Sequence, residues 1–409
     1  MAFDPMQEKG MPLEKQLLTY EEIASRPYDK KEVHPYTRCR AILMNGIEVE
    51  AALFGHQFAR NAPDLELRRQ LAAVRRIEQQ QQKAVNWLIP GDESGLEVTI
   101  GFEQVAVDLT AYLARTETNP KVKAALDFAL LEDFDHLYRY ANLMNMTEGK
   151  RAAEITGEYT EIMPGRPTAL EHRHPFDEVR EFADRTKGDP LTNLHILTIV
   201  AAEQQTMNLY MNIGNRPTDQ LGRELYAEIA QIEEQHVTHY ESLLDARAGW
   251  FEMLLLHEYN ECWLYWSLVQ DEPDERIRRI WERNLEMEIH HLHLAAKLFQ
   301  KQEKRDPAEV LPAQMPEPFR FQSNVGYVRE ILAEQAHWNA HGTEYYPRDA
   351  MPDDDRYRMY QEAVGAVHAP SVRVIDEHER KQGAEYRQEL EGEHPIAEMR
   401  PGKKGKAGA

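Results

Sequence analysis

The sequence has few cysteines and no long apolar run. Its 409 residues include two cysteines, Cys39 and Cys262, too few for a disulfide framework, a cysteine-rich zinc module or a four-cysteine iron site. No stretch approaches the roughly 18–20 uninterrupted apolar residues that a membrane-spanning helix needs. The first eleven residues also lack the basic and then apolar layout of a signal peptide. We therefore expect a cytoplasmic protein without a membrane partner.

Positive charge is scarce as well. The chain has 48 Lys and Arg against 70 Asp and Glu, which gives a formal net charge of −22. Binding to a phosphate backbone needs basic patches, and the only basic cluster is a short tail at Lys403, Lys404 and Lys406. The composition therefore argues against a nucleic-acid partner.

Helical spacing is abundant. Long segments rich in Ala, Leu, Glu, Gln, Arg and Met have helical periodicity, and few segments alternate in the manner of half-buried strands. Proline-dense stretches near 147–190 and 305–322 interrupt the helices. We predict an all-α protein with an N-terminal arm (1–40), a first helical bundle (41–146), a connecting segment (147–190), a second bundle (191–304) and a C-terminal helical extension (305–409).

Acidic residues recur at a fixed spacing. Four glutamates each precede a second acidic residue by thirty positions, in the pairs Glu48/Glu78, Glu103/Asp133, Glu203/Glu233 and Glu258/Glu288. A proline lies near the midpoint of each pair, at Pro63, Pro120, Pro217 and Pro273. This repeat predicts four antiparallel helical hairpins in which the two acids of a pair face each other at similar height.

A histidine follows three of the four second acids. His136, His236 and His291 each come three residues after the acid, and Gln81 takes this position in the remaining hairpin. Residues at i and i+3 share a helix face, so an acid and a histidine at this spacing can bind one metal ion from one helix. The match of histidine to the thirty-residue repeat favours a metal site over ordinary solvated acidic faces.

The second half of the chain resembles the ferritin-like di-iron carboxylate superfamily, which includes rubrerythrins, bacterioferritins and manganese catalases. Members supply a lone Glu from two helices and Glu-x-x-His from two others. The resemblance implies two tandem four-helix ferritin-like bundles, with two Fe or Mn ions in the second. The ligands that it implies are Glu203, Glu233, His236, Glu258, Glu288 and His291.

Two tyrosines extend the resemblance. Tyr210 and Tyr265 each lie seven residues after a lone glutamate, two helical turns along the same face. In similar proteins such a tyrosine donates a hydrogen bond to a metal carboxylate or takes part in electron transfer. We therefore take both as candidate catalytic residues, with ordinary core packing as the alternative.

The first half departs from this pattern. Its less complete set consists of Glu48, Glu78, Glu103, Asp133 and His136. Gln81 replaces one histidine, and Gly55 and Thr110 occupy the positions of the two tyrosines. This half would hold a further metal site, or it is a decayed copy kept for packing.

The pairing of the hairpins is left open. A long crossover joins the second and third helices of the usual ferritin-like bundle, but only 25 residues separate the acids of these helices in each half. Either each bundle runs up-down-up-down, or hairpins exchange between the halves or between subunits of a homo-oligomer.

The function implied is that of an oxidoreductase, catalase-like activity included, that acts on dioxygen or a peroxide at paired Fe or Mn ions. The two cysteines cannot form an electron-donor module, so reductive chemistry would need an external electron donor. The alternatives are a protein that oxidises or stores iron and a structural ferritin-like scaffold.

Overall fold

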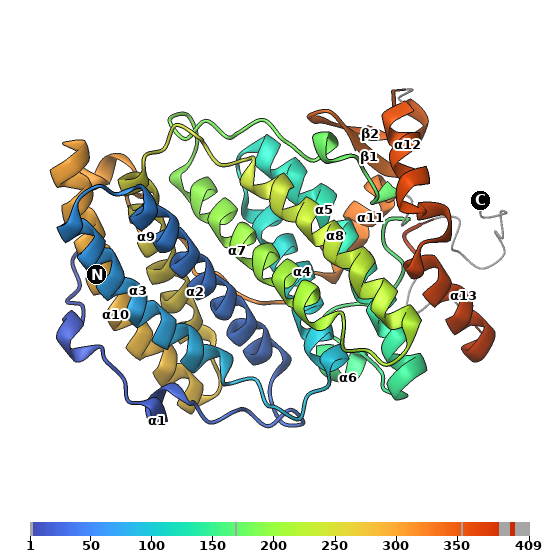
Figure 1. The fold of residues 1–409 in the computed structure, drawn as a ribbon, viewed down its shortest axis with the longest axis horizontal. Helices are drawn as coiled ribbons and strands as arrows, with labels where there is room; N and C mark the ends of the chain where they lie inside the picture. Colours follow the sequence, from blue (N-terminus) through green and yellow to red (C-terminus); the bar gives the residue numbers. More distant parts are fainter. Residues whose placement is uncertain (1–2, 168–169, 353–354, 384–392, 397–409) are drawn as a thin grey trace.

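The protein is mostly helical in the computed structural model, which describes residues 3–167, 170–352, 355–383 and 393–396 (Figure 1). The long helices are α2 (Pro35–Asn61), α3 (Leu65–Asn86), α4 (Gly95–Thr116), α5 (Pro120–Glu148), α7 (Pro190–Ile213), α8 (Gln220–Glu241), α9 (Trp250–Asp271) and α10 (Glu275–Glu303). The shorter ones are α1 (Tyr20–Ile23), α6 (Ala153–Thr156), α11 (Val325–Gln335), α12 (Asp355–Val364) and α13 (Pro370–Gln382). This architecture confirms the helical prediction.

The predicted C-terminal extension also contains a small antiparallel sheet. Strands β1 (Trp338–His341) and β2 (Glu344–Pro347) pair with Ala340 opposite Tyr345. The sequence pattern did not predict this hairpin. The basic tail at 403–406 lies outside the described residues.

The turns of the four predicted hairpins lie where the prolines indicate. Each proline lies in or next to the turn between two long helices, and the second helix begins at a side chain that accepts hydrogen bonds from its first backbone N–H groups. These N-cap residues are Asp64, Asn119, Asp219 and Asp274. Such caps satisfy N–H groups that have no partner within the helix.

The hairpins pack in two groups that do not follow chain order (Figure 1). The outer group consists of α2, α3, α9 and α10, and the inserted group of α4, α5, α7 and α8. Tyr265 of α9 donates a hydrogen bond to Glu48 of α2, and Tyr210 of α7 donates one to Glu103 of α4. The inserted group is one continuous stretch, residues 95–241, placed between the two hairpins of the outer group.

The predicted bundles 41–146 and 191–304 are therefore wrong in their pairing of hairpins. Short segments at 87–94 and 242–249 carry the chain between the groups, whereas the long segment 149–189 joins α5 to α7 inside the inserted group. All four hairpins carry an acidic face, so the spacing of acids does not select a partner. Hairpin exchange within one chain, one of the arrangements left open, is the one found.

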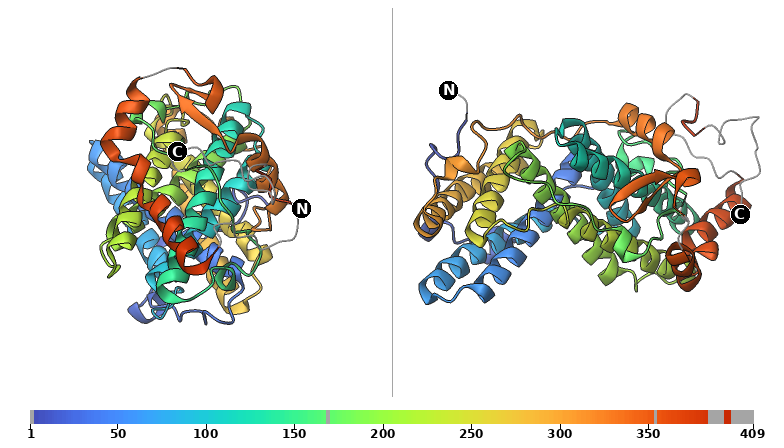
Figure 2. Two further views of the ribbon diagram at one scale, coloured as in Figure 1. Left: turned by 90° about the vertical axis from the view of Figure 1, so that its right-hand side faces the viewer. Right: turned by 90° about the horizontal axis from the view of Figure 1, so that it is seen from above.

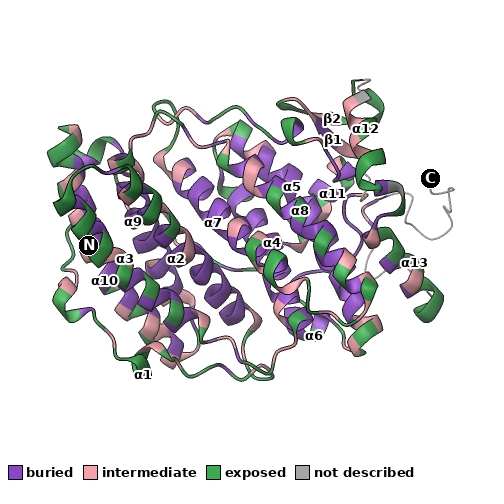
Figure 3. Ribbon diagram, in the orientation of Figure 1, coloured by how far each residue is buried: buried purple, intermediate pink, exposed green. Residues whose placement is uncertain are grey.

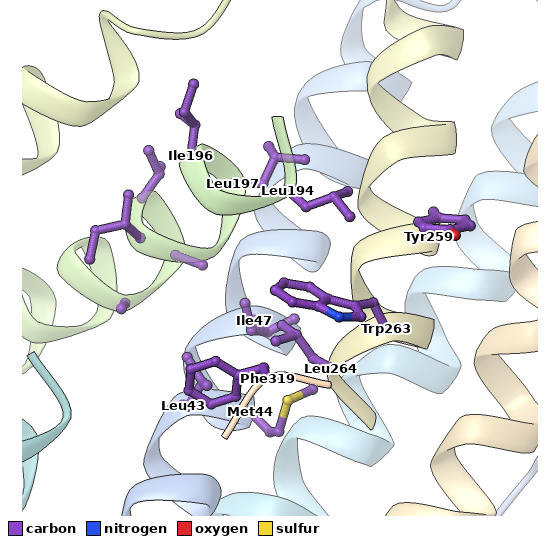
Figure 4. Packing of buried hydrophobic residues seen from close by; sticks show 14 of the residues in the cluster. Leu43, Met44, Ile47, Leu194, Ile196, Leu197, Tyr259, Trp263, Leu264 and Phe319 are labelled. Atoms are coloured by element: carbon purple, nitrogen blue, oxygen red, sulfur yellow. The ribbon is translucent and has the colours of Figure 1, made fainter. Parts of the chain in front are cut away.

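An apolar core joins the two groups. Helices α2 and α7 carry buried residues along most of their lengths, and the groups lie side by side along the molecule (Figures 2 and 3). Leu43 and Ile47 of α2 lie near Leu197 of α7 and Trp263 of α9 in one cluster (Figure 4). Gly46 permits this approach, because a Cβ there would lie 2.6 Å from the Gln205 side chain. The groups are thus parts of one packed body.

The C-terminal segments cover the inserted group. Helix α11 packs on α5, and α13 packs on both α5 and α8. The Tyr345 hydroxyl of β2 lies 3.1 Å from Nε2 of His239 in α8.

Among the described residues, no helix has both the length and the apolar character that crossing a bilayer requires.

Candidate metal centres

Six side chains of the inserted group converge at one buried point, which we call the inserted centre. They are Glu103 (α4), Asp133 and His136 (α5), Glu203 (α7), and Glu233 and His236 (α8). Each is at most 1% exposed. They form two overlapping groups, and the ligand atoms within each group lie within 4.8 Å of one another. Glu233 belongs to both groups.

The two histidines of the inserted centre have the same orientation. Nδ1 of His236 lies 3.1 Å from Oδ1 of Asp133, and its Nε2 lies 3.0 Å from Oε2 of Glu132. Nδ1 of His136 lies 3.0 Å from Oε1 of Glu233, and its Nε2 lies 3.7 Å from Oε2 of Glu171. Each ring thus presents one nitrogen to the centre and the other to an outer carboxylate, the arrangement that orients histidine ligands in metal sites.

The crossover segment 149–189 fixes one of these outer carboxylates. Nη1 of Arg166 and Nη1 of Arg173 each donate a 2.6 Å hydrogen bond to Oε1 of Glu132. Burial would raise the pKa of Glu132, but Arg173 and Arg166 hold it well below its usual range. Glu132 is therefore a buried anion behind His236. The segment predicted as a connection between bundles instead completes one centre.

Charge within the inserted centre is unevenly distributed. Burial raises the pKa values of Glu103 and Glu203 well above normal. Burial disfavours the charged form of His136 and His236, but nearby carboxylates raise the pKa of both rings. Despite burial, the same two rings lower the pKa of Glu233 to about 2. Protons on the histidines and carboxylates thus supply the positive charge of this centre, and bound divalent cations would replace them.

Several buried carboxylate oxygens of the inserted centre accept no hydrogen bond of good geometry from the described residues. They are both oxygens of Asp133, both of Glu203, Oε2 of Glu103 and Oε2 of Glu233. A buried polar atom without a partner costs free energy, and a coordinated cation would satisfy several of these oxygens at once. Four carboxylates and two imidazoles suit Fe or Mn, so the donor set fits the implied ions.

A second cluster, the outer centre, lies among the helices of the outer group. Its two ligand groups are Glu78 with Glu258 and His291, and Glu48 with Glu261 and Glu288. All six side chains are at most 4% exposed. Oε2 of Glu48, of Glu258 and of Glu261 accepts no hydrogen bond from the part of the chain that the structure describes. The outer centre therefore also fits metal ions, with five carboxylates and one imidazole.

Gln81 occupies the position of the missing histidine in the outer centre. Its side-chain amide donates a hydrogen bond to Glu288. Nδ1 of His291 lies 2.9 Å from Oε2 of Glu288, and its Nε2 lies 2.8 Å from Oε1 of Gln16 in the N-terminal arm. The outer partner of this histidine is thus a neutral amide.

The two candidate tyrosines serve one centre each. Tyr210 donates to Glu103 in the inserted centre, and Tyr265 donates to Glu48 in the outer centre. Each tyrosine therefore contacts the lone glutamate of the facing hairpin. Gly55 and Thr110 occupy the corresponding positions in the other two hairpins. Each centre still has one tyrosine, because each group combines one hairpin that has the tyrosine with one that lacks it.

The predicted ligand sets are each divided between the two centres. Of the predicted complete set, the structure places Glu203, Glu233 and His236 in the inserted centre, and Glu258, Glu288 and His291 in the outer centre. Of the less complete set, Glu103, Asp133 and His136 lie in the inserted centre, and Glu48 and Glu78 lie in the outer one. Both sets were thus grouped incorrectly, because hairpins pair across the halves of the chain.

Several residues around the centres were missed. Glu261 lies three residues after Glu258 on the same helical face, a spacing that could have revealed it. Glu132 adjoins Asp133, but adjacent helical residues point in different directions. Glu171 and Gln16 lie outside the repeat, and no sequence signal indicates their positions.

A cavity of about 480 Å³ reaches the outer centre. It lies between α3, α9 and α10, and Glu258 and His291 form part of its lining. Two ligands of the outer centre thus form part of the wall of this cavity.

Comparisons with known proteins give no match. Searches against family models, curated proteins and solved structures find nothing similar to this chain.

Proposed function

We propose that this protein is a di-metal carboxylate oxidoreductase that holds two Fe or Mn ions in the inserted centre and acts on dioxygen or a peroxide. The observation that carries the proposal is the membership of Glu233 in both ligand groups. One carboxylate common to two sets of ligands suits a pair of metal ions with a bridging glutamate.

The order of the inserted helices supports the proposal. The long segment 149–189 joins the second helix of this group, α5, to its third, α7. Ferritin-like bundles have one long crossover connection of this kind. We therefore propose a ferritin-like bundle for the inserted group, and a second one for the outer group, interrupted by the first.

The residues present divide into two sets of ligands. Asp133, Glu203 and His236 would hold one ion, Glu103 and His136 would hold the other, and Glu233 would contact both. A pair of bound Fe or Mn ions supplies one- and two-electron redox chemistry toward oxygen species.

The chain itself orients these ligands and excludes water. Burial of all six side chains keeps bulk solvent away. Glu132 and Glu171 lie behind the two histidines and fix their rings. The Tyr210 hydroxyl donates to Oε1 of Glu103, which orients that carboxylate and holds a proton within hydrogen-bond distance of a ligand oxygen.

The outer centre would hold further Fe or Mn ions. Its unpartnered carboxylate oxygens and its histidine form two ligand groups, as in the inserted centre. Iron handling remains the rival function, and metal stoichiometry separates the two. An oxidoreductase keeps about two ions in each occupied centre, whereas a storage protein loads many more.

The test is metal content by elemental analysis of protein purified without chelators. We compare wild type with Glu233→Ala and with Glu234→Ala, a matched control because Glu234 is the exposed neighbour of Glu233 on α8. We expect Glu233→Ala to lose about two ions per chain and Glu234→Ala to keep them. Loaded wild type should then consume peroxide, or dioxygen with a reductant, faster than Glu233→Ala.

Two results would contradict the proposal. One is wild-type protein that binds no transition metal even after anaerobic reconstitution with Fe(II) or Mn(II). The other is loaded protein whose peroxide and dioxygen consumption is the same in wild type and in Glu233→Ala.

A further inference from the structure

The cavity at the outer centre has apolar walls and a polar inner end. Its volume of about 480 Å³ is in the range of small-molecule sites, about 300–1,000 Å³. Glu258 and His291 line it and are 3% and 1% exposed. Aliphatic side chains of α3, α9 and α10 form the walls, among them Leu71, Val74, Leu254, Leu294 and Leu298. The walls suit an alkyl chain.

Positive charge gathers where the cavity meets solvent. Lys297 and Lys301 of α10 line it, are exposed, and lie four residues apart on one helical face. Arg69 and Glu66 of α3 also line it, and they pair with each other at 3.5 Å. Within the described part of the chain, no carboxylate forms an ion pair with either lysine. In a chain of net charge −22, this pair of lysines favours an anionic ligand.

The distance between the lysines and the centre sets the length of the ligand. Lys301 follows His291 by ten residues, about 15 Å along the helix. Since a C–C bond is about 1.5 Å long, an extended alkyl chain advances roughly 1.3 Å per carbon. About 12 carbons therefore span the distance to Lys301, and about 7 span the six-residue distance of about 9 Å to Lys297.

We propose that this cavity binds a long-chain carboxylate. The carboxylate lies at Lys297 and Lys301, and the alkyl chain runs along the apolar walls toward Glu258 and His291. A cationic amphiphile would meet like charge at the lysines, and a short acid would leave the walls uncovered. The role of this ligand as a substrate of the outer centre rests on the proposed function, whereas its binding does not.

The first test is calorimetric titration of the full chain with dodecanoate. Three comparison compounds each change one property of dodecanoate. Acetate lacks the long alkyl chain, 1-dodecanol lacks the charge, and dodecyltrimethylammonium carries a positive charge instead of a negative one. We expect one dodecanoate per chain, bound at least tenfold more tightly than each comparison compound. Equal affinity for any of the three would overturn the proposal.

Variants locate the ligand. Lys297→Glu and Lys301→Glu should each weaken dodecanoate binding at least tenfold, and Val74→Trp should do so by filling the cavity. Lys187→Glu is the matched control, because that lysine side chain is 80% exposed and does not line the cavity. Both cavity lysines are at the surface, so their variants should melt as wild type does. Unchanged binding in both lysine variants contradicts the inference.

Failure of the two proposals gives different results. Dodecanoate binding by a chain that takes up no metal upholds this site and contradicts the proposed function. Metal uptake together with a lack of dodecanoate binding contradicts this site alone.

Discussion

The inserted and outer centres share a plan but differ in their surroundings. The inserted centre has two histidines, each backed by a carboxylate, and a crossover segment whose arginines neutralise Glu132. The outer centre has one histidine backed by the neutral Gln16, and a cavity reaches it. Hairpins built on one repeat can therefore form two kinds of centre. In one, the histidines have charged outer partners; in the other, the histidine has a neutral outer partner and a cavity lies beside the ligands.

The largest expected difference concerns these outer partners. Arg173→Met should lower the free energy of unfolding by about 3–5 kcal/mol, because it removes a buried ion-pair partner of both Glu132 and Glu178 and leaves Glu178 without its arginine. Gln16→Met should cost about 2 kcal/mol, because it removes two neutral hydrogen bonds, one with His291 and one to the Met11 carbonyl, each worth about 1 kcal/mol. Denaturant unfolding of metal-free protein measures both. Equal losses would show that the two centres do not differ in this way.

A pH-dependent difference of roughly 3 kcal/mol is expected at His239 in the inserted group. Burial lowers the pKa of His239 to about 4, although Glu178 opposes the shift. The unfolded chain binds this proton below about pH 6.5 and the folded chain only below about pH 4. The contribution of His239 to stability is therefore complete above pH 6.5 and is lost as pH falls toward 4.

Unfolding of His239→Gln at pH 7.5 and pH 4.5 checks this expectation. The variant should lose less stability than wild type between the two values. Three residues after His291, the outer group has Leu294, so Leu294→Ala should leave the pH dependence as in wild type. A wild-type pH dependence in His239→Gln would rule out the assignment to this ring.

Gln81→His should make the outer centre more like the inserted one. The change supplies the missing imidazole beside Glu288, and imidazole favours Fe over harder ions. We expect Fe(II) to bind this centre about tenfold more tightly, a gain of about 1.4 kcal/mol. Anaerobic Fe(II) titration of Gln81→His in a Glu233→Ala background isolates the outer centre, with Gln81→Asn as control. Equal affinity in the two variants would count against a ligand role for position 81.

The smallest effects should come from the tyrosine of each centre. Tyr210→Phe and Tyr265→Phe each remove one hydrogen bond to a lone glutamate, and each such bond should contribute about 1 kcal/mol to the free energy of unfolding. Tyr265→Phe also removes the hydrogen bond that Asn284 donates to the Tyr265 hydroxyl, so its loss should be somewhat larger. Denaturant unfolding of the two variants in parallel measures the free energy of unfolding that each one loses. A loss confined to one variant would mean that the tyrosines are not equivalent.

Local features of the fold were predictable from the sequence. The thirty-residue spacing and the prolines located the hairpins, because turns and N-caps such as Asp64 depend on neighbouring residues only. The i, i+3 rule likewise identified candidate ligands such as Glu233 and His236, since one helix fixes their relative positions.

Long-range features were not predictable. Four similar acidic faces allow more than one pairing of hairpins, and the pairing found brings together residues far apart in the chain, such as Glu48 and Tyr265. Gln16 and Arg173 reach their centres from irregular segments, where no periodicity shows which way a side chain points. The β1–β2 hairpin was missed because its strands are only four residues each.

The insertion of one group within the other sets an order of assembly. Tyr265 and Glu48 are 217 residues apart in the chain, so α2 and α3 are synthesised long before α9 and α10. At about 5–20 residues per second, this interval lasts roughly 10 to 40 s. The inserted group is complete by residue 241 and can fold during that time, while the acidic face of α2 and α3 lacks its partner. The outer centre can therefore form only after the whole inserted group has been synthesised.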